Sequence, residues 1–281
     1  MYTYETLALD LNPNGVLTLS LNRPDIRNAF NAKMIEELGR VFTHEVLSPE
    51  VKVVVFQGSK LKDGSGMFCA GGDLNWMKRS IELTYEENLK DTTTLTEMFA
   101  TLNECPKPVI GIVEGAAIGG GVGLVSICDI VLSTKETVFS LSEVRLGIVP
   151  ACIGPFVIAK IGASHSRELF VSAERFKADK AKAIGLVHEV FNTRAELDLH
   201  LKTLTQNLLE CGPKAITVAK RLILDLTWPE KRARVPDPIH YVAQTLAELR
   251  VGAEAQEGIT AFLQKRKPQW IKSKTGGKNE T

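Results

Sequence analysis

The chain has 281 residues, of which 44% are hydrophobic, and its formal net charge is +1. This length allows one large core, or a domain with an appendage. A near-neutral chain has no overall field to recruit DNA, RNA or an anionic membrane. The sequence has no apolar stretch of the ~18 residues that a membrane span needs, and its N-terminus lacks the basic and apolar regions of a signal peptide. The five cysteines are scattered without a CxxC pair, which is typical of reduced thiols in a cytoplasmic protein.

Alternating strands and helices are favoured as far as residue 191. The predicted strands are residues 4–10, 15–21, 51–56, 109–113, 129–132, 138–141 and 186–191. One predicted helix begins after an N-cap at Asn31, and a second covers residues 74–99. A short helix follows the triplet Gly119-Gly120-Gly121, and further short helices fill residues 155–185.

From residue 196 onward the sequence is almost entirely helical. Asp237 and Pro238 predict the start of one helix, and the last one begins near Glu254. We therefore predict an α/β body over residues 1–192 and a helical C-terminal region over residues 193–281.

Two glycine-rich turns each follow a strand and lead into a helix. One is Phe68 to Asp73 and contains Gly72; the other is the triplet that contains Gly120. If the two turns converge, their N–H groups can form an oxyanion hole with two donors. Tight turns that bind no ligand would show the same pattern.

Glu143 is a lone carboxylate in an apolar run from Leu141 to Val149. Apolar surroundings raise the pKa of a carboxyl, which then both accepts and donates a proton more readily. The alternative is an ordinary carboxylate at a strand end that faces water or pairs with Arg145, since residues i and i+2 of a strand share a face.

Other kinds of site find little support. A dinucleotide motif fails because Leu124 stands where the last glycine of GxGxxG belongs, and no P-loop motif is present. None of the five histidines is paired at the spacing of a metal site or accompanies a GxSxG nucleophile motif, so we expect neither a metal nor a serine triad. The basic run Lys265-Arg266-Lys267 is either a solvated tail or, with Phe262 one turn earlier, part of a phosphate pocket.

Several stretches in the same order resemble the crotonase, or enoyl-CoA hydratase/isomerase, superfamily. They are NRPDIRNAFN, FCAGGDL, GAAIGGG, SEVRLGIVP and EGITAFLQKRKPQW. The resemblance implies a spiral of ββα turns with a C-terminal helical trimerisation region, in a homotrimer or hexamer. It also implies a coenzyme A thioester as substrate, with no separate cofactor.

The resemblance also assigns roles to residues. The N–H groups of Gly72 and Gly120 would hold the thioester oxygen beside Glu143. Substrate-binding roles would fall to Arg27, Ala29, Ala70, Asp73, Leu74 and Gly123, and to Phe262 and Lys265 at the nucleotide end of coenzyme A, in the same or a neighbouring subunit.

One position departs from the family pattern. Hydratases of the main type carry two catalytic glutamates, and the first of these positions is Gly123 here, while the second is Glu143. We expect a space beside Gly123 that a distal carboxylate or bulky branch of the substrate fills. A Gly123→Glu change would then favour a small crotonyl substrate.

The stretches GGDLNWMKRS, YEENL, LSEVRLGIVPACIGPFV and RKPQW look more narrowly like 3-methylglutaconyl-CoA and isohexenylglutaconyl-CoA hydratases of leucine and acyclic terpene breakdown. This predicts hydration of a branched 2-enoyl-CoA. The alternatives are a Δ3,Δ2-enoyl-CoA isomerase that uses Glu143 alone, and a CoA- or RNA-binding member with little catalysis.

Overall fold

The computed structural model describes residues 3–271, and its contacts divide the chain into two compact units, Met1–Thr203 and Leu204–Thr281. The division falls inside a helix, α7 (Arg194–Glu210), whereas the sequence places the boundary just before that helix begins. The predicted order, an α/β body followed by helices, is confirmed. No helix among the described residues is long and apolar enough to cross a bilayer.

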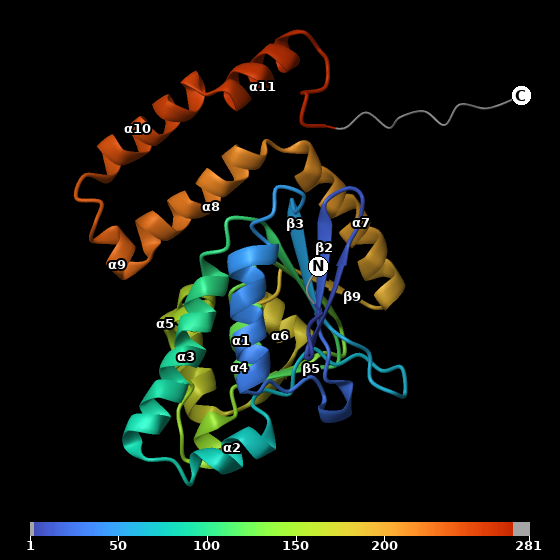
Figure 1. Cartoon of the computed structure of the whole chain (residues 1–281), viewed down its shortest axis with the longest axis vertical. Coiled ribbons are helices and arrows are strands. Elements are labelled where there is room, and N and C mark those ends of the chain that lie inside the picture. Colours follow the sequence, from blue (N-terminus) through green and yellow to red (C-terminus); the bar gives the residue numbers. More distant parts are fainter. Residues whose placement is uncertain (1–2, 272–281) are drawn as a thin grey trace, which may run out of the picture. The chain divides into compact units, whose positions relative to one another are not determined.

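Two sheets form the body of the first unit (Figure 1). Their strands are β1 (Leu7–Leu11), β2 (Val16–Leu21), β3 (Val53–Gly58), β4 (Val109–Val113), β5 (Ala116–Ile118), β6 (Ile130–Thr134), β7 (Val138–Ser140), β8 (Arg175–Lys177) and β9 (Glu189–Phe191). The larger sheet has the order β1-β2-β3-β4-β6-β9, and only its β1–β2 pair is antiparallel. The smaller sheet has the order β5-β7-β8, with β5 parallel to β7 and β8 antiparallel to it.

The antiparallel pair β1–β2 forms a hairpin. The side-chain oxygen of Asn12 accepts hydrogen bonds from the N–H groups of Asn14 (2.9 Å) and Val16 (3.1 Å). An asparagine that bonds to the backbone two residues further on stabilises a turn, which here aligns Leu11 with Leu17.

Three successive stretches of the first unit repeat one path: a strand of the larger sheet, a short extended segment beside the smaller sheet, and a helix. The second stretch is β4, β5 and α4 (Gly120–Ser126); the third is β6, β7 and α5 (Gly154–Ser172). In the first, β3 leads to residues 68–72, which bridge to β5 at Cys69, and then to the helices α2 and α3. Because β3, β4 and β6 are parallel neighbours, each stretch advances the chain by one strand, and the chain forms the predicted spiral of ββα turns.

Residues 74–99 form two helices and not the single predicted one. Four residues separate α2 (Leu74–Ser80) from α3 (Tyr85–Asn103). The Thr84 side chain accepts a hydrogen bond from the Glu87 N–H, and the Glu87 carboxylate accepts one from the Thr84 N–H. This reciprocal capping box satisfies two N–H groups that would lack partners, so a new helix starts here.

The other helical segments of the first unit are η1 (Pro24–Ile26), α1 (Ala32–Arg40), η2 (Val41–Glu45), η3 (Glu143–Leu146) and α6 (Ala178–Ala183). Asn31 is the N-cap of α1, as predicted, because its side chain accepts a hydrogen bond from the Met34 N–H. α1 packs on α3, and α4 packs on α5 (Figure 1). Residues 155–185 contain one long kinked helix, the unpredicted strand β8 and α6, where only short helices were expected.

A histidine side chain joins β6 to the segment that leads into β9. The backbone N–H of Val131 donates to the ring atom Nδ1 of His188 (2.9 Å). The backbone N–H of His188 donates to the Val131 carbonyl (2.9 Å). Since Nδ1 accepts, the ring is neutral in the folded state. Burial lowers the pKa of His188, and the charge of Lys160 lowers it further.

We therefore expect acid to weaken the fold through His188. Its contribution to the free energy of unfolding is constant above the ordinary histidine pKa of about 6.5. It declines as the pH drops below that value towards the lowered folded-state pKa, because the unfolded chain takes up the proton first. Denaturant unfolding at about pH 7.5 and about pH 5.5 should show a larger loss of stability for the parent chain than for His188→Asn. An equal loss in both would contradict this role.

The second unit is helical in its described part. Its helices are the end of α7, α8 (Pro213–Thr227), α9 (Pro229–Arg232), α10 (Pro238–Val251) and α11 (Ala253–Leu263). Asp237 caps α10 by accepting a hydrogen bond from the His240 N–H (3.0 Å), as the sequence predicts. The Glu254 carboxylate accepts from the N–H groups of Lys214 and Ala215, and so holds the start of α8 against that of α11.

Candidate active site

The two glycine turns lie side by side in the first unit. The backbone carbonyl of Cys69 accepts a hydrogen bond from the Ile118 N–H (3.0 Å), and the backbone N–H of Cys69 donates to the Ala116 carbonyl (3.1 Å). A Cβ atom added to Gly71 would lie 3.9 Å from the amide nitrogen of Gly120. The two turns therefore lie close together, which is the condition for an oxyanion hole, and their use as one stays a prediction.

The backbone N–H groups of Gly72 and Gly120 point away from the hydrogen bonds that hold each turn in place. Phe30 bridges to Gly72 by donating to the Gly71 carbonyl (2.9 Å) and accepting from the Asp73 N–H (2.9 Å). In this parallel pattern the N–H of Gly72 itself faces away from Phe30. Gly120 is the first residue of α4, and the N–H of a first residue has no acceptor within its helix.

Bare backbone is required at the triplet. Gly119 has φ 53° and ψ −122°, a conformation that side chains with a Cβ rarely adopt. A Cβ atom on Gly120 would lie 2.3 Å from Cζ of Phe30, so the ring of Phe30 covers this glycine directly. Substitution at either position would displace the turn or the ring.

Glu143 lies against the same triplet. A Cβ atom on Gly119 would be 3.0 Å from Oε1 of Glu143. The Gly119 N–H donates to the carbonyl of Ser140 at the end of β7 (2.8 Å), which fixes the triplet to the segment that leads to Glu143. Oε2 of Glu143 is buried and has no hydrogen-bond partner among the described residues. Burial raises the pKa of Glu143 above that of an ordinary glutamate, so this carboxyl can take up and release a proton closer to neutral pH.

The alternative in which Glu143 stands at a strand end and pairs with Arg145 is wrong. Glu143 is the first residue of the 3-10 helix η3, where residues two apart do not share a face. The Arg145 guanidinium donates to the carbonyl of Ala173 (3.1 Å). No ion pair joins Arg145 to Glu143 within residues 3–271.

The space expected beside Gly123 does not exist. A Cβ atom on Gly123 would lie 2.4 Å from Cγ2 of Ile153, 2.8 Å from its Cβ and 2.9 Å from Cε1 of Phe99. All three residues are buried. Gly123 therefore packs tightly in the core, and neither a substrate carboxylate nor a branch fits there.

The remaining predicted binding residues of the first unit differ in what they contact. Ala29 is buried, Ala70 is half-buried, and Arg27 is exposed, with its carbonyl accepting from the Ala70 N–H (3.1 Å). Leu74 is 81% exposed, so it is free to meet another molecule.

Asp73 is engaged within the fold. Its carboxylate caps α2 by accepting from the Asn75 N–H (2.7 Å), and it forms an ion pair with Arg23 (2.7 Å). These partners hold the pKa of Asp73 below its usual value against the opposing effect of burial, which is the largest single contribution. The described contacts give Asp73 a role in starting α2 beside Gly72, while direct substrate binding stays a prediction.

In the second unit, Phe262 is 82% exposed and Lys265 adopts a left-handed conformation just after α11. Arg266 forms an ion pair with Glu257 (2.6 Å), which lowers the pKa of Glu257 to about 2. Trp270 donates to the Glu210 carbonyl (3.0 Å). The segment after α11 is thus fixed to its own unit as far as residue 271, and Arg266 of the basic run is already paired.

Sequence reasoning missed two residues of the site, Phe30 and Trp76. Phe30 covers Gly120, and its ring centroid lies 6.0 Å from that of Trp76. The benzo edge of Trp76 would lie 3.4 Å from a Cβ atom on Gly72. Only the order of motifs could have suggested them, since Phe30 lies in NRPDIRNAFN and Trp76 directly follows the glycine turn that contains Gly72. In residues 3–271, no group of three or more His, Cys, Asp and Glu side chains could hold a metal ion.

The family model for enoyl-CoA hydratase/isomerase matches residues 12–273, and the chain belongs to this family, the crotonase superfamily. The peroxisomal Delta(3,5)-Delta(2,4)-dienoyl-CoA isomerase of Arabidopsis thaliana is 29% identical over 97% of this chain and 99% of its own. The 2,3-dehydroadipyl-CoA hydratase of Escherichia coli is 31% identical over 91% and 94%. The crystal structure of an enoyl-CoA hydratase from Shewanella pealeana superposes with a TM-score of 0.86 at 34% identity, over 95% and 96% of the two chains.

Proposed function

We propose that this protein is an enoyl-CoA hydratase that adds water to a branched 2-enoyl-CoA of the 3-methylglutaconyl or isohexenylglutaconyl type. One observation carries the proposal. Glu143, a half-buried carboxylate with a buried Oε2 and a raised pKa, lies against the glycine triplet, and the neighbouring turn contains Gly72. An acid beside two backbone N–H groups suits the addition of water next to a thioester carbonyl.

In the proposed reaction, the N–H groups of Gly72 and Gly120 donate to the thioester oxygen. The carboxylate of Glu143 takes one proton from a water molecule as the water oxygen bonds to C3. The electron pair of the C2–C3 double bond moves to form an enolate, whose oxygen the two N–H groups stabilise. Glu143 then returns its proton to C2, so one water molecule is added and the enzyme is restored. Each such donor typically contributes about 10²–10³-fold in rate.

The filled position at Gly123 favours a second candidate function. With Ile153 and Phe99 occupying that place, the site has Glu143 as its acid, and a single carboxyl suffices to move a proton between carbons. A Δ3,Δ2-enoyl-CoA isomerase would use it so, without adding water. One relative is itself named an isomerase, and another a hydratase.

Turnover in isotopic water separates the two reactions. A 2-enoyl-CoA incubated with the protein in ¹⁸O-labelled water should yield a 3-hydroxyacyl-CoA that carries one labelled oxygen. Mass spectrometry of the product measures this. A product of unchanged mass, without labelled oxygen and with its double bond moved, would establish the isomerase and refute the hydratase.

The branched acyl group is supported by the sequence stretches around Trp76 and Glu143, which look like those of glutaconyl-type hydratases. A panel of acyl-CoA substrates that includes 3-methylglutaconyl-CoA tests it, and equal rates with a straight-chain crotonyl thioester would count against it.

Assembly into a homotrimer or hexamer is also part of the proposal. Large apolar side chains are exposed along α8, α10 and α11, and they are Ile223, Ile239, Leu246, Val251, Ile259, Phe262 and Leu263. Contiguous exposed apolar surface often marks a protein–protein interface. The molar mass in solution tests this, and a monomer at micromolar concentration would refute it.

A further inference from the structure

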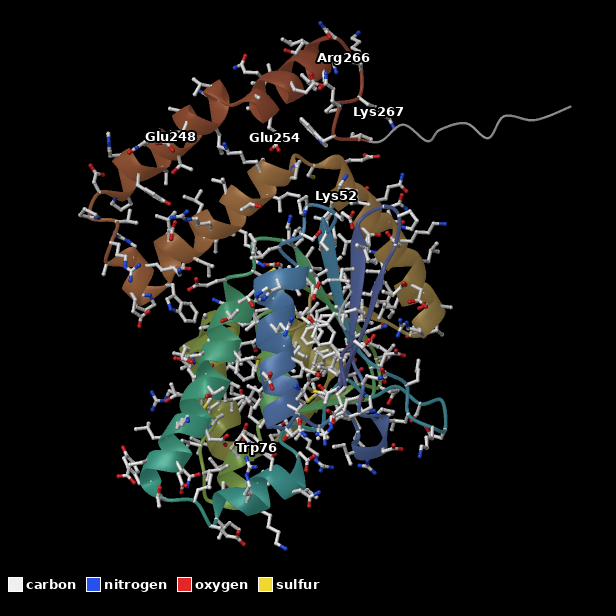
Figure 2. The ribbon with its side chains drawn as sticks, in the orientation of Figure 1. Lys52, Trp76, Glu248, Glu254, Arg266 and Lys267 are labelled. Atoms are coloured by element: carbon white, nitrogen blue, oxygen red, sulfur yellow. The ribbon has the colours of Figure 1, made fainter. Side chains whose placement is uncertain are left out.

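Trp76 carries a buried indole N–H that has no acceptor among the residues the structure describes. In residues 3–271, the buried side-chain nitrogen and oxygen atoms without a hydrogen-bond partner are Nε1 of Trp76 and Oε2 of Glu143. Figure 2 labels Trp76 on α2, the helix whose N-cap, Asp73, follows Gly72. The indole N–H is a donor only, and native structures satisfy most buried donors. An acceptor from outside the chain is therefore expected.

The two unpartnered atoms belong to one site. Trp76 packs its benzo edge, atoms Cε3 and Cζ3, at 3.4 Å from the Cβ direction of Gly72. Its ring also neighbours Phe30, which covers Gly120, and Glu143 lies against Gly119. The elements that carry Trp76 and Glu143 follow equivalent points of the first and third ββα turns, so the fold brings a donor and an acid to the same two glycine turns.

The orientation of the ring indicates where the acceptor lies. In an indole, Nε1 is on the edge opposite Cε3 and Cζ3. Since that benzo edge faces Gly72, the N–H is on the side of the ring remote from this glycine. The acceptor is thus not the thioester oxygen, which the proposed function places at the N–H groups of Gly72 and Gly120.

We propose that Trp76 is a specificity-determining residue whose indole N–H donates to an oxygen of the acyl chain beyond the enoyl group, with a distal carboxylate as the substrate class. This rests on the proposed function, because it takes the thioester to be bound at the two turns. A hydrogen bond to a charged acceptor is stronger than a neutral one. A site with an unpaired donor also discriminates against an analogue that lacks the acceptor.

A matched pair of substrates tests the proposal. The pair is 3-methylglutaconyl-CoA and 3-methylpent-2-enoyl-CoA, in which a methyl group replaces the carboxylate. Trp76→Phe should lower kcat/KM about ten- to a hundredfold for the first, and change it little for the second. Trp270→Phe is the matched control, because it removes an indole N–H that already donates to Glu210, and it should leave the ratio of the two substrates unchanged. Equal losses with both substrates for Trp76→Phe would indicate a packing role and overturn the proposal.

A binding experiment keeps the proposal separate from the hydratase reaction. The unmutated protein, labelled with ¹⁵N at tryptophan, is saturated with the unreactive thioesters 3-methylglutaryl-CoA or 3-methylvaleryl-CoA. The indole N–H resonance of Trp76, assigned from Trp76→Phe, should move downfield with the first and not with the second. The same position with both ligands and with none would show that water is its acceptor, which would refute the proposal. If the resonance moves as expected but no labelled oxygen is incorporated in turnover, only the hydratase function fails.

Discussion

Replacing Glu143 with glutamine should abolish turnover while binding of the thioester persists. Glutamine keeps the shape of the side chain beside Gly119 but can no longer take a proton from water or return it to carbon. Because one carboxyl would serve both as base and as acid, we expect a loss in kcat of about 10³-fold or more, at the upper end of what one such group contributes. Steady-state kinetics and the affinity for an unreactive thioester measure the two effects separately.

Glu136→Gln is the matched control for this change. Glu136 lies in the connection between β6 and β7, where it is exposed and pairs with Lys177 (2.5 Å). It should leave kcat and binding unchanged. Substantial activity in Glu143→Gln, or a loss of binding as large as the loss of rate, would remove Glu143 from the chemistry.

The pH profile gives an independent measure of the same residue. The base form of Glu143 must be present for water to be activated, and burial raises its pKa. Activity should therefore fall on the acid side with an apparent pKa above that of an ordinary glutamate, and be retained as the pH rises past it. Arg145→Gln should not shift this limb, because Arg145 bonds to the Ala173 carbonyl.

Local sequence signals predicted most elements of the fold. Asn31 and Asp237 are N-caps in the structure because a cap depends on residues within one turn of it. The same kind of signal, Thr84 followed by Glu87, marks the start of α3 inside the single helix predicted over residues 74–99. The break between α2 and α3 is therefore predictable from the sequence alone.

The backbone conformation at Glu143 cannot be predicted from such local signals. Apolar residues on both sides suggested a strand, but β7 ends at Ser140 because its pairing with β5 and β8 stops there. These partners come from segments distant in the sequence. Residue order did place Gly72, Gly120 and Glu143 together, because each follows the second strand or extended segment of a ββα turn.

Which side chains fill the space beside Gly123 also depends on tertiary packing. Ile153 lies at the start of α5 and Phe99 near the end of α3, so neither is a sequence neighbour of Gly123. The absence of a side chain at position 123 predicted an opening, and packing filled it. Close-packed interiors rarely leave such a volume empty.

Gly123→Glu should therefore destabilise the fold and leave crotonyl turnover no faster. The first atom of any side chain here would lie 2.4 Å from Ile153 and 2.9 Å from Phe99. Overpacking of this kind costs about 1–3 kcal/mol, and a carboxylate buried without a partner adds several more, about 3 kcal/mol or above. Denaturant unfolding measures the sum. Gly123→Ala should show the overpacking part alone, and Ile153→Ala combined with it should recover some of the loss, because Cγ2 of Ile153 makes the shortest contact. A Gly123→Glu protein as stable as the parent, with faster hydration of a crotonyl thioester, would mean that Ile153 and Phe99 yield readily and that one change restores the glutamate that main-type hydratases carry at this position.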